Sequence, residues 1–293
     1  MKVAIAGPTG HVGSKLASGL LDAGAEAVLL CRDPAKVTAL TARGAKVDAG
    51  DLENGDYVLR ATRGVDALFW LSPPNFTTPN LHGFQEGLAR NAAEAIRKNA
   101  ISRVVNLSSI GAQMPSGTGP VAGLHQVEHV LNETGASVTH LRAGYFMENH
   151  LFALHSIREA GSVFLPVGAD VSVPMVATQD VAAVALACLL NASSEGQQVR
   201  GIHGPADLSF GAAASTVGQA IGRPVRHVEV TPEDARKAFL GMGTSPDVAA
   251  KYVEMYQAFG DGRLKVAEPR RPETTTPTTL LQFAVASIKP LLT

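Results

Sequence analysis

The sequence predicts an α/β protein: a Rossmann-type, doubly wound parallel sheet with a smaller α+β lobe toward the carboxyl end. Two observations support this prediction. Short runs rich in valine and isoleucine alternate with helical patterns through the first half of the chain, as they do in a parallel sheet covered by helices on both faces. The first of these runs ends in three glycines spaced three residues apart and is followed at once by a helical pattern.

Strands and helices are expected to alternate through the first 150 residues. The strands are expected over residues 3–6, 27–31, 46–49, 67–71, 103–107 and 137–141. The helices are expected between them, over residues 12–23, 34–42, 56–61, 81–99 and 124–134. Pro34 directly follows Asp33, which is the usual order of a helix cap and a first-turn proline.

The pattern changes near residue 150, where prolines and glycines interrupt the apolar runs. Helices are expected over residues 151–160, 181–190, 210–221, 232–240, 247–259 and 280–288, and Asp180 is expected to cap the second of them. Strands are expected within residues 163–176 and over 199–203 and 225–230, and residues 268–277 form a proline-rich irregular arm. No clean linker cuts the chain. We therefore expect a domain of residues 1–150 and a smaller lobe of residues 151–293 that is interleaved with it.

Composition and charge exclude several classes of protein. The chain has 293 residues, 45% of them apolar, and a formal net charge of −1, with basic and acidic residues mixed throughout. This pattern gives no basis for binding nucleic acid or an acidic membrane surface. The longest apolar run, residues 181–190, is too short to span a bilayer, and no signal-peptide core follows Met1. Cys31 and Cys188 stand far apart in apolar surroundings, so we expect reduced thiols in a cytoplasmic protein.

The glycine-rich stretch at residues 7–13 indicates a binding site for a dinucleotide. Gly7 allows the chain to turn at the strand end, Gly10 lets the backbone approach a pyrophosphate, and Gly13 lets the helix pack closely. No glycine is followed by Lys and Ser or Thr at the offset that a nucleoside-triphosphatase loop needs. The residues expected at the dinucleotide are Gly7, Thr9, Gly10, His11, Val12 and Gly13. The alternative is a structural turn that happens to be rich in glycine.

The residue after the second strand indicates which dinucleotide binds. Ligands of doubly wound sheets lie at the carboxyl ends of the strands. Arg32 stands at such an end, and its planar guanidinium suits the 2′-phosphate of NADP(H), with Lys36 as a further positive charge. NAD(H) is less favoured, because Asp33 is better placed as a helix cap than as a ligand of the ribose. In the alternative, Arg32 is a solvated charge and Asp33 binds the ribose.

The ends of the third and fourth strands supply further candidate contacts to the cofactor. Asp51 and Leu52 follow the third strand, where Asp51 could accept a hydrogen bond from the adenine amino group. Leu71, Ser72 and Pro73 follow the fourth strand, where two consecutive prolines stiffen a backbone edge beside the ribose and pyrophosphate. The alternative at both places is a plain loop.

The ends of the fifth and sixth strands point to the reacting end of the cofactor. Ser108 and Ser109 follow the fifth strand, and their hydroxyls would face the nicotinamide. Tyr145 and Phe146 follow the sixth strand and could wall a substrate pocket. Either aromatic residue could instead fill the core.

Together these motifs resemble the NmrA-like family of atypical short-chain dehydrogenase/reductases. The resemblance spans at least residues 1–260, and its motifs are Gly7–Gly13, Cys31–Pro34, Gly50–Leu52, Leu107–Ser109, His125–Glu128 and Leu141–Asn149. It implies a Rossmann domain with a smaller substrate-binding lobe, and NADP(H) bound by the glycine turn and Arg32. Members of the family include reductases of quinones, azo dyes or plant phenolic ethers, and cofactor sensors that perform no turnover.

The sequence departs from short-chain dehydrogenases in general at the helix after the fifth strand. Most of these enzymes carry Tyr-x-x-x-Lys there, in which the lysine makes the tyrosine a proton donor. Residues 119–128 contain neither tyrosine nor lysine. The usual interconversion of a carbonyl and an alcohol is therefore not expected.

Two functional hypotheses remain. In the first, the protein is an NADPH-dependent reductase of a small quinone-like or azo-aromatic electrophile, and His125 with Ser108, or else Tyr145, supplies the proton. In the second, it is an NADP(H)-binding sensor that acts through a regulatory protein partner. The alternative for His125 is a packed, hydrogen-bonded helix residue. No metal site is expected, since His129, one turn after His125, is not part of an H-E-x-x-H motif. The sequence leaves open whether the protein forms a homodimer.

Overall fold

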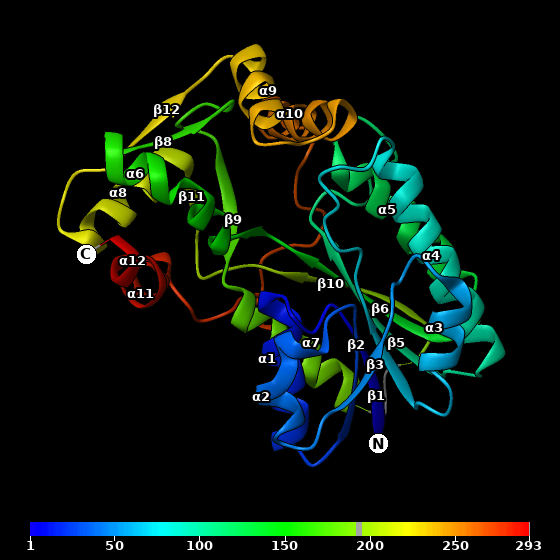
Figure 1. Ribbon diagram of the computed structural model, residues 1–293. Coiled ribbons are helices and arrows are strands. Elements are labelled where there is room, and N and C mark those ends of the chain that lie inside the picture. The colour runs from blue at the N-terminus through cyan, green and yellow to red at the C-terminus, as the bar shows by residue number, and fades with distance from the viewer. Residues whose placement is uncertain (192–194, 293) are drawn as a thin grey trace.

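The main sheet is parallel throughout and doubly wound. The computed structural model describes residues 1–191 and 195–292. Within these residues, seven strands form this sheet, in the spatial order β10 (Gln197–Ile202), β6 (Ser137–Ala143), β5 (Arg103–Ser109), β4 (Ala67–Trp70), β1 (Lys2–Ala6), β2 (Glu26–Cys31) and β3 (Lys46–Ala49) (Figure 1). The chain winds from β1 outward to β3 and then from β4 outward to β10, so the switch point lies between β1 and β4. The predicted fold class is confirmed.

Helices cover both faces of this sheet (Figure 1). One face carries α1 (His11–Asp22), α2 (Thr38–Thr41) and α7 (Thr178–Leu190), and the other carries α3 (Gly55–Ala61), α4 (Leu81–Lys98) and α5 (Pro120–Asn132). Successive strand residues point to opposite faces: Ile5 packs with the α1 layer, and Ala4 packs with the α4 layer. Because both faces are covered, the central strands are apolar along their whole length.

The second lobe has its own small sheets and its own core. Strands β11 (Asp207–Ser209), β9 (Ser172–Val176) and β7 (Tyr145–Phe146) form one sheet in that order, and β8 (Ser162–Leu165) pairs in parallel with β12 (Arg226–Glu229). The helices of the lobe are α6 (Leu154–Ala160), α8 (Phe210–Ile221), α9 (Pro232–Gly241), α10 (Pro246–Gly260), α11 (Leu280–Phe283) and α12 (Lys289–Leu292). Short 3-10 segments cover Pro34–Val37, Met147–Ala153 and Pro272–Thr274, and Ala284–Ile288 is π-helical.

The two parts of the chain are interleaved. Both α7 and β10 lie after residue 150, yet α7 packs on the main sheet and β10 extends it beside β6. The structure therefore has no single boundary at residue 150. The division into residues 1–150 and 151–293 describes how the sequence pattern changes rather than a cut between two compact bodies.

The start of α7 corrects one expectation. The helix begins at Thr178, three residues earlier than expected, and Asp180 lies inside its first turn instead of capping it. The backbone N–H and the hydroxyl of Thr178 both donate to the Glu148 carboxylate. Asp180 accepts hydrogen bonds from the backbone and hydroxyl of Thr278. A carboxylate 30 residues away in the sequence thus caps this helix, which a local pattern cannot indicate.

Candidate functional site

The glycine turn between β1 and α1 is held in one conformation by its own backbone. Gly7 has a φ of +65°, which residues with a Cβ rarely adopt, and the Gly10 N–H donates to its carbonyl oxygen over 3.1 Å. A Cβ on Gly13 would lie 2.2 Å from that same oxygen. Gly13 therefore lets the first turn of the helix pack on the glycine turn itself, rather than on the sheet.

The amino end of α1 is open to an anion. Gly10 is the cap residue of this helix and makes no side-chain capping bond. A Cβ on Gly10 would meet only the Gly7 oxygen, at an ordinary contact distance of 3.5 Å, so the space above it is free of protein. Thr9 and His11 are exposed beside it, and Val12 is buried. First-turn N–H groups and the helix dipole attract negative charge, so this turn fits a pyrophosphate.

The tips of β2 and β3 lie side by side and present an exposed cation. The Arg32 side chain is 82% exposed, and its Nη1 lies 4.0 Å from a carboxylate oxygen of Asp51. Asp33 accepts a hydrogen bond from the Ala35 N–H, so it caps the following turn as expected. Leu52 is buried beneath this edge. A guanidinium so weakly engaged is available to a phosphate, whereas the carboxylate of Asp33 is already used.

The end of β4 meets the glycine turn at the switch point. The side chain of Leu71 lies against Gly7, where an added Cβ would be 3.1 Å from its Cδ2 atom. The Ser72 hydroxyl is buried and, within the described residues, has no hydrogen-bond partner. Pro73 is half-buried beside it. Buried hydroxyls normally have partners, so this orphaned group at the crevice fits a site that receives a polar ligand.

Ser108 belongs to a buried ionic network. Its hydroxyl donates to Glu128 over 2.6 Å, and the Arg142 guanidinium donates to both oxygens of Glu128 and to Glu268. Burial alone would raise the pKa of Glu128, but the hydrogen bonds from Arg142 and Ser108 outweigh it, and the net pKa is lowered. The Ser108 proton is therefore committed to a carboxylate, and the network joins β5, α5 and β6 to the arm before α11.

His125 lies on α5 and does not line the main cavity described below. Its Nδ1 atom is 2.8 Å from the Ala112 carbonyl oxygen, and its ring lies 5.6 Å from that of His129. The half-buried imidazole thus has the packing and hydrogen bonding expected of a structural residue. In the described part of the chain, no group of three or more His, Cys, Asp or Glu side chains is arranged to hold a metal ion.

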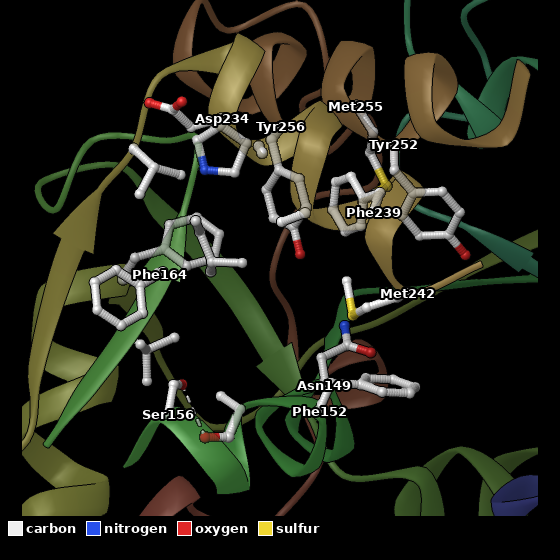
Figure 2. A pocket seen from close by; sticks show the side chains of 18 of the residues that line it. Asn149, Phe152, Ser156, Phe164, Asp234, Phe239, Met242, Tyr252, Met255 and Tyr256 are labelled. Carbon is white, nitrogen blue, oxygen red and sulfur yellow. Dashed lines mark hydrogen bonds between the residues drawn. The ribbon is translucent and has the colours of Figure 1, made fainter. Parts of the chain in front are cut away.

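A large apolar cavity opens in the second lobe. Its volume is about 700 Å³, and the loop after β4, the segment after β6 and helix α10 all contribute to its wall (Figure 2). The side chains that carry the argument below are Phe76, Tyr145, Asn149, Phe152, Asp234, Met242, Tyr252 and Tyr256. Among the wall residues that the structure describes, Asp234 is the only acidic one, and none is lysine or arginine. Such a cavity suits an uncharged aromatic molecule with a few polar groups.

Tyr145 is brought to this cavity by the short strand β7. That strand pairs with β9, and a Cβ on the preceding Gly144 would lie 2.3 Å from the Pro174 oxygen, so glycine is required for this close approach. The Tyr145 hydroxyl lies 3.3 Å from that of Tyr256. Of the three candidate catalytic side chains, Tyr145 alone lines the cavity.

Several wall residues were missed in the sequence. Phe76 follows the two prolines after β4, and Tyr256 lies on α10, more than 100 residues after Tyr145. Tyr252 and Tyr256 share one face of α10 because they are four residues apart, which is a signal that could have been used. That spacing is equally typical of a core stripe, so it would not have identified the cavity.

The chain resembles known reductases. Residues 7–192 match the family model described as NAD(P)H-binding. The chain is 32% identical over 254 residues to NAD(P)H azoreductase of Xenophilus azovorans, covering 87% of this chain and 86% of that protein. It is 30% identical over 276 residues to (4-alkanoyl-5-oxo-2,5-dihydrofuran-3-yl)methyl phosphate reductase of Streptomyces griseus, covering 93% and 92% of the two chains.

Solved structures share the whole architecture. The NADPH complex of an NADPH-dependent quinone oxidoreductase from Escherichia coli matches with a TM-score of 0.81 at 23% identity, over 98% of this chain and 99% of that one. Triphenylmethane reductase of Citrobacter sp. complexed with NADP(H) matches with a TM-score of 0.79 at 20% identity, over 97% and 99% of the chains. At these identities the likeness shows the fold.

Proposed function

This chain belongs to the NAD(P)H-binding family, and on that premise we propose that it is an NADPH-dependent oxidoreductase of a small quinone-like or azo-aromatic electrophile. The family match and the reductase relatives confirm the resemblance seen in the sequence. The observation that carries the substrate class is the aromatic, nearly uncharged cavity of about 700 Å³, whose wall includes Phe76 and Tyr145 from the carboxyl ends of β4 and β6.

Each part of the cofactor site has a role in this proposal. When bound, NADPH supplies a hydride. The open amino end of α1 binds the pyrophosphate, and Arg32 binds the 2′-phosphate, which favours NADP(H) over NAD(H). Asp51 and Leu52 hold the adenine end, and the end of β4 from Leu71 to Pro73 runs beside the ribose and pyrophosphate.

The cavity provides the second half of the site. Ligands of doubly wound sheets bind outside the carboxyl ends of the strands, and two loops from those ends reach the cavity. Its aromatic wall excludes water from the substrate and binds flat ring systems through offset and edge-on contacts. The proposal therefore assigns the electrophile to the second lobe and the cofactor to the first.

Steady-state oxidation of NADPH tests this function directly. We expect turnover with an uncharged naphthoquinone and with azobenzene, and no turnover when the electrophile is omitted. NADPH that binds tightly but is oxidised by neither compound, nor by any other member of a quinone and azo panel, would count against the proposal. The same assay with NADH in place of NADPH measures the preference between the two cofactors.

A second candidate function is a sensor that binds NADP(H) and acts through a protein partner. The absence of tyrosine and lysine from residues 119–128 favours it, as does the commitment of the Ser108 hydroxyl to Glu128. A partner retained only in the presence, or only in the absence, of NADP(H) would support this function.

Cytoplasmic location and a homodimer stay predictions. Among the described helices, none is long and apolar enough to cross a bilayer.

A further inference from the structure

Two tyrosine hydroxyls meet inside the cavity. Tyr145 comes from β7 and Tyr256 from α10, and their oxygens are 3.3 Å apart although 111 residues separate them in the chain. Both side chains are buried, with 8% and 7% of their surface exposed. Figure 2 shows the Tyr256 ring extending from α10 with its hydroxyl directed toward the middle of the cavity, and the Asn149 amide below it. The Asn149 side chain also lines the cavity and lowers the pKa of the Tyr145 phenol.

This arrangement determines which proton is available to a ligand. Each phenol has one O–H proton to donate, whereas its oxygen can also accept. When Tyr256 and the Asn149 amide both donate to the Tyr145 oxygen, the Tyr145 proton is left for a molecule in the cavity. The wall near Tyr145 includes Phe210, at 5.4 Å between ring centroids, and His150, whose Nδ1 atom already contacts the Met147 carbonyl oxygen.

We propose that Tyr145 donates the proton that accompanies hydride transfer, and that Tyr256 and Asn149 are positioning residues that orient its hydroxyl. This inference rests on the proposed function. It also gives the chain a candidate proton donor although the Tyr-x-x-x-Lys pair is missing, with two neutral groups from α10 and the segment after β7 beside that donor. The sequence pointed to Tyr145 as one of three candidates, but it did not indicate these two partners.

The step balances with the reactants already named. Two-electron reduction of an N=N bond consumes one hydride and one proton. The hydride forms a new bond to one nitrogen and converts NADPH to NADP⁺, and the electron pair of the N=N π bond moves to the other nitrogen. That nitrogen takes the Tyr145 proton as the tyrosine O–H bond breaks. The phenolate regains a proton from water at the cavity mouth, where Phe152 is 83% exposed.

The environment keeps Tyr145 protonated until it reacts. Burial raises the pKa of the Tyr145 phenol above its ordinary value of 10.0, and the hydrogen bonds with Tyr256 and Asn149 oppose part of that rise. Burial also raises the pKa of Tyr256 well above its ordinary value. Both groups are therefore neutral donors at neutral pH.

The need for a proton donor depends on the substrate. Reduction of a quinone leaves the charge on a hydroquinone oxygen, which is a weak base and requires little help. Reduction of azobenzene places the charge on nitrogen, which is a far stronger base and gains more from a positioned acid. Loss of the donor should therefore affect the azo substrate selectively, whereas a merely structural defect would affect both substrates alike.

The experiment compares azobenzene with a naphthoquinone in the full-length protein. We expect Tyr145→Phe to lower kcat for azobenzene by roughly 100-fold or more and kcat for the quinone by less than about tenfold. We expect Tyr256→Phe to lower kcat for azobenzene by about tenfold, with KM little changed. Tyr252→Phe is the matched control, because Tyr252 lines the same cavity one turn earlier on α10. Loss of the Tyr252 hydroxyl should change kcat for azobenzene and kcat for the quinone by the same factor.

Two further readouts separate chemistry from folding. The wild-type protein should show a solvent isotope effect on kcat for azobenzene in heavy water, and Tyr145→Phe should lose it. NADPH binding, followed by fluorescence, should be the same in all variants. If Tyr145→Phe lowered kcat equally for both substrates, or kept the isotope effect unchanged, the inference would be overturned and the proposed function would stand. No turnover of any quinone or azo compound in the panel by the wild-type protein would overturn the proposed function and the inference with it.

Discussion

His140 shows how a single buried residue links stability to pH. The side chain is 1% exposed, and its two ring nitrogens contact the amides of Asn106 and Asn132. Burial lowers the pKa of His140 from 6.5 to about 4. Since the unfolded chain titrates near 6.5, it binds more protons than the folded chain between these two values. Stability from this group is therefore fully present above pH 6.5 and is lost as pH falls toward 4.

We predict that the free energy of unfolding falls by about 2 kcal/mol because of His140 between pH 7 and pH 5. Urea unfolding at both values measures the fall. The variant His140→Gln retains a polar side chain that cannot titrate, so its unfolding free energy should depend less on pH over this range. An equal dependence in the variant and the wild type would show that another group causes the fall.

Also at the residue scale, we propose that Arg32 determines the preference for NADP(H) over NAD(H). We predict that Arg32→Glu weakens binding of NADPH by roughly 10- to 100-fold, because a charge-assisted contact to the 2′-phosphate is lost, and weakens binding of NADH far less. Titrations of both cofactors measure the ratio. Arg63→Glu is the matched control, since Arg63 is exposed in the turn before β4, at the amino ends of the parallel strands, whereas Arg32 follows the carboxyl end of β2. Equal losses for both cofactors would contradict the role given to Arg32.

At the scale of elements, the cap of α7 joins the two parts of the molecule. Glu148 follows β7, next to the segment that carries Tyr145, and accepts the hydrogen bonds from Thr178 at the start of the helix. Thr178 is 2% exposed, so its N–H would lack a partner without this carboxylate. The position of the cavity wall and the packing of α7 on the main sheet are therefore coupled.

We predict that Glu148→Ala lowers the free energy of unfolding by about 1–3 kcal/mol, because a buried helix end loses its acceptor. Thermal or urea unfolding measures the change. Glu159→Ala removes a carboxylate from an exposed position on α6 and should change stability by less than about 0.5 kcal/mol. A Glu148→Ala protein as stable as the control would show that water replaces the carboxylate at this helix end.

Several elements could be predicted because their signals are local. The spacing of apolar residues predicts the strands of the main sheet and helices such as α8, and capping residues within a few positions mark the helix ends. Helix α5 starts four residues earlier than expected, at Pro120, because the preceding Gly119 adopts a φ of +60° that the sequence pattern does not reveal. The two-residue strand β7 was also missed, since it exists only by pairing with β9.

At the scale of the whole molecule, we expect the charge of the cavity wall to select among substrates. Among the described residues of this wall there is no lysine or arginine, and the one carboxylate belongs to the exposed Asp234. A sulfonate that entered would lose its hydration without gaining a cationic partner, which is costly. Cationic and neutral aromatic molecules do not face this penalty.

We predict that kcat/KM is at least roughly 100-fold higher for 4-dimethylaminoazobenzene than for its sulfonated analogue. The two dyes have the same azo group, so steady-state rates with NADPH isolate the effect of charge. Asp234→Lys should raise kcat/KM for the sulfonated dye and so reduce the ratio of the two kcat/KM values. Lys237→Asp is the control, because it changes an exposed charge on the same helix outside the cavity wall. Equal rates for the two dyes in the wild-type protein would contradict this selectivity.

The sequence by itself predicted the strands of the main sheet, the glycine turn and the position of Arg32 after β2, because each signal lies in residues that are neighbours in the chain. A strand, a tight turn and a helix need only about a dozen consecutive residues, and the carboxyl end of β2 is fixed once the strand is known. The tertiary structure decided the rest. It placed β10 beside β6, committed Ser108 to Glu128, left His125 on a packed helix and joined Tyr145 to Tyr256 in one cavity. These contacts link residues 13 to 111 positions apart, so no local pattern indicates them and only the folded chain brings them together.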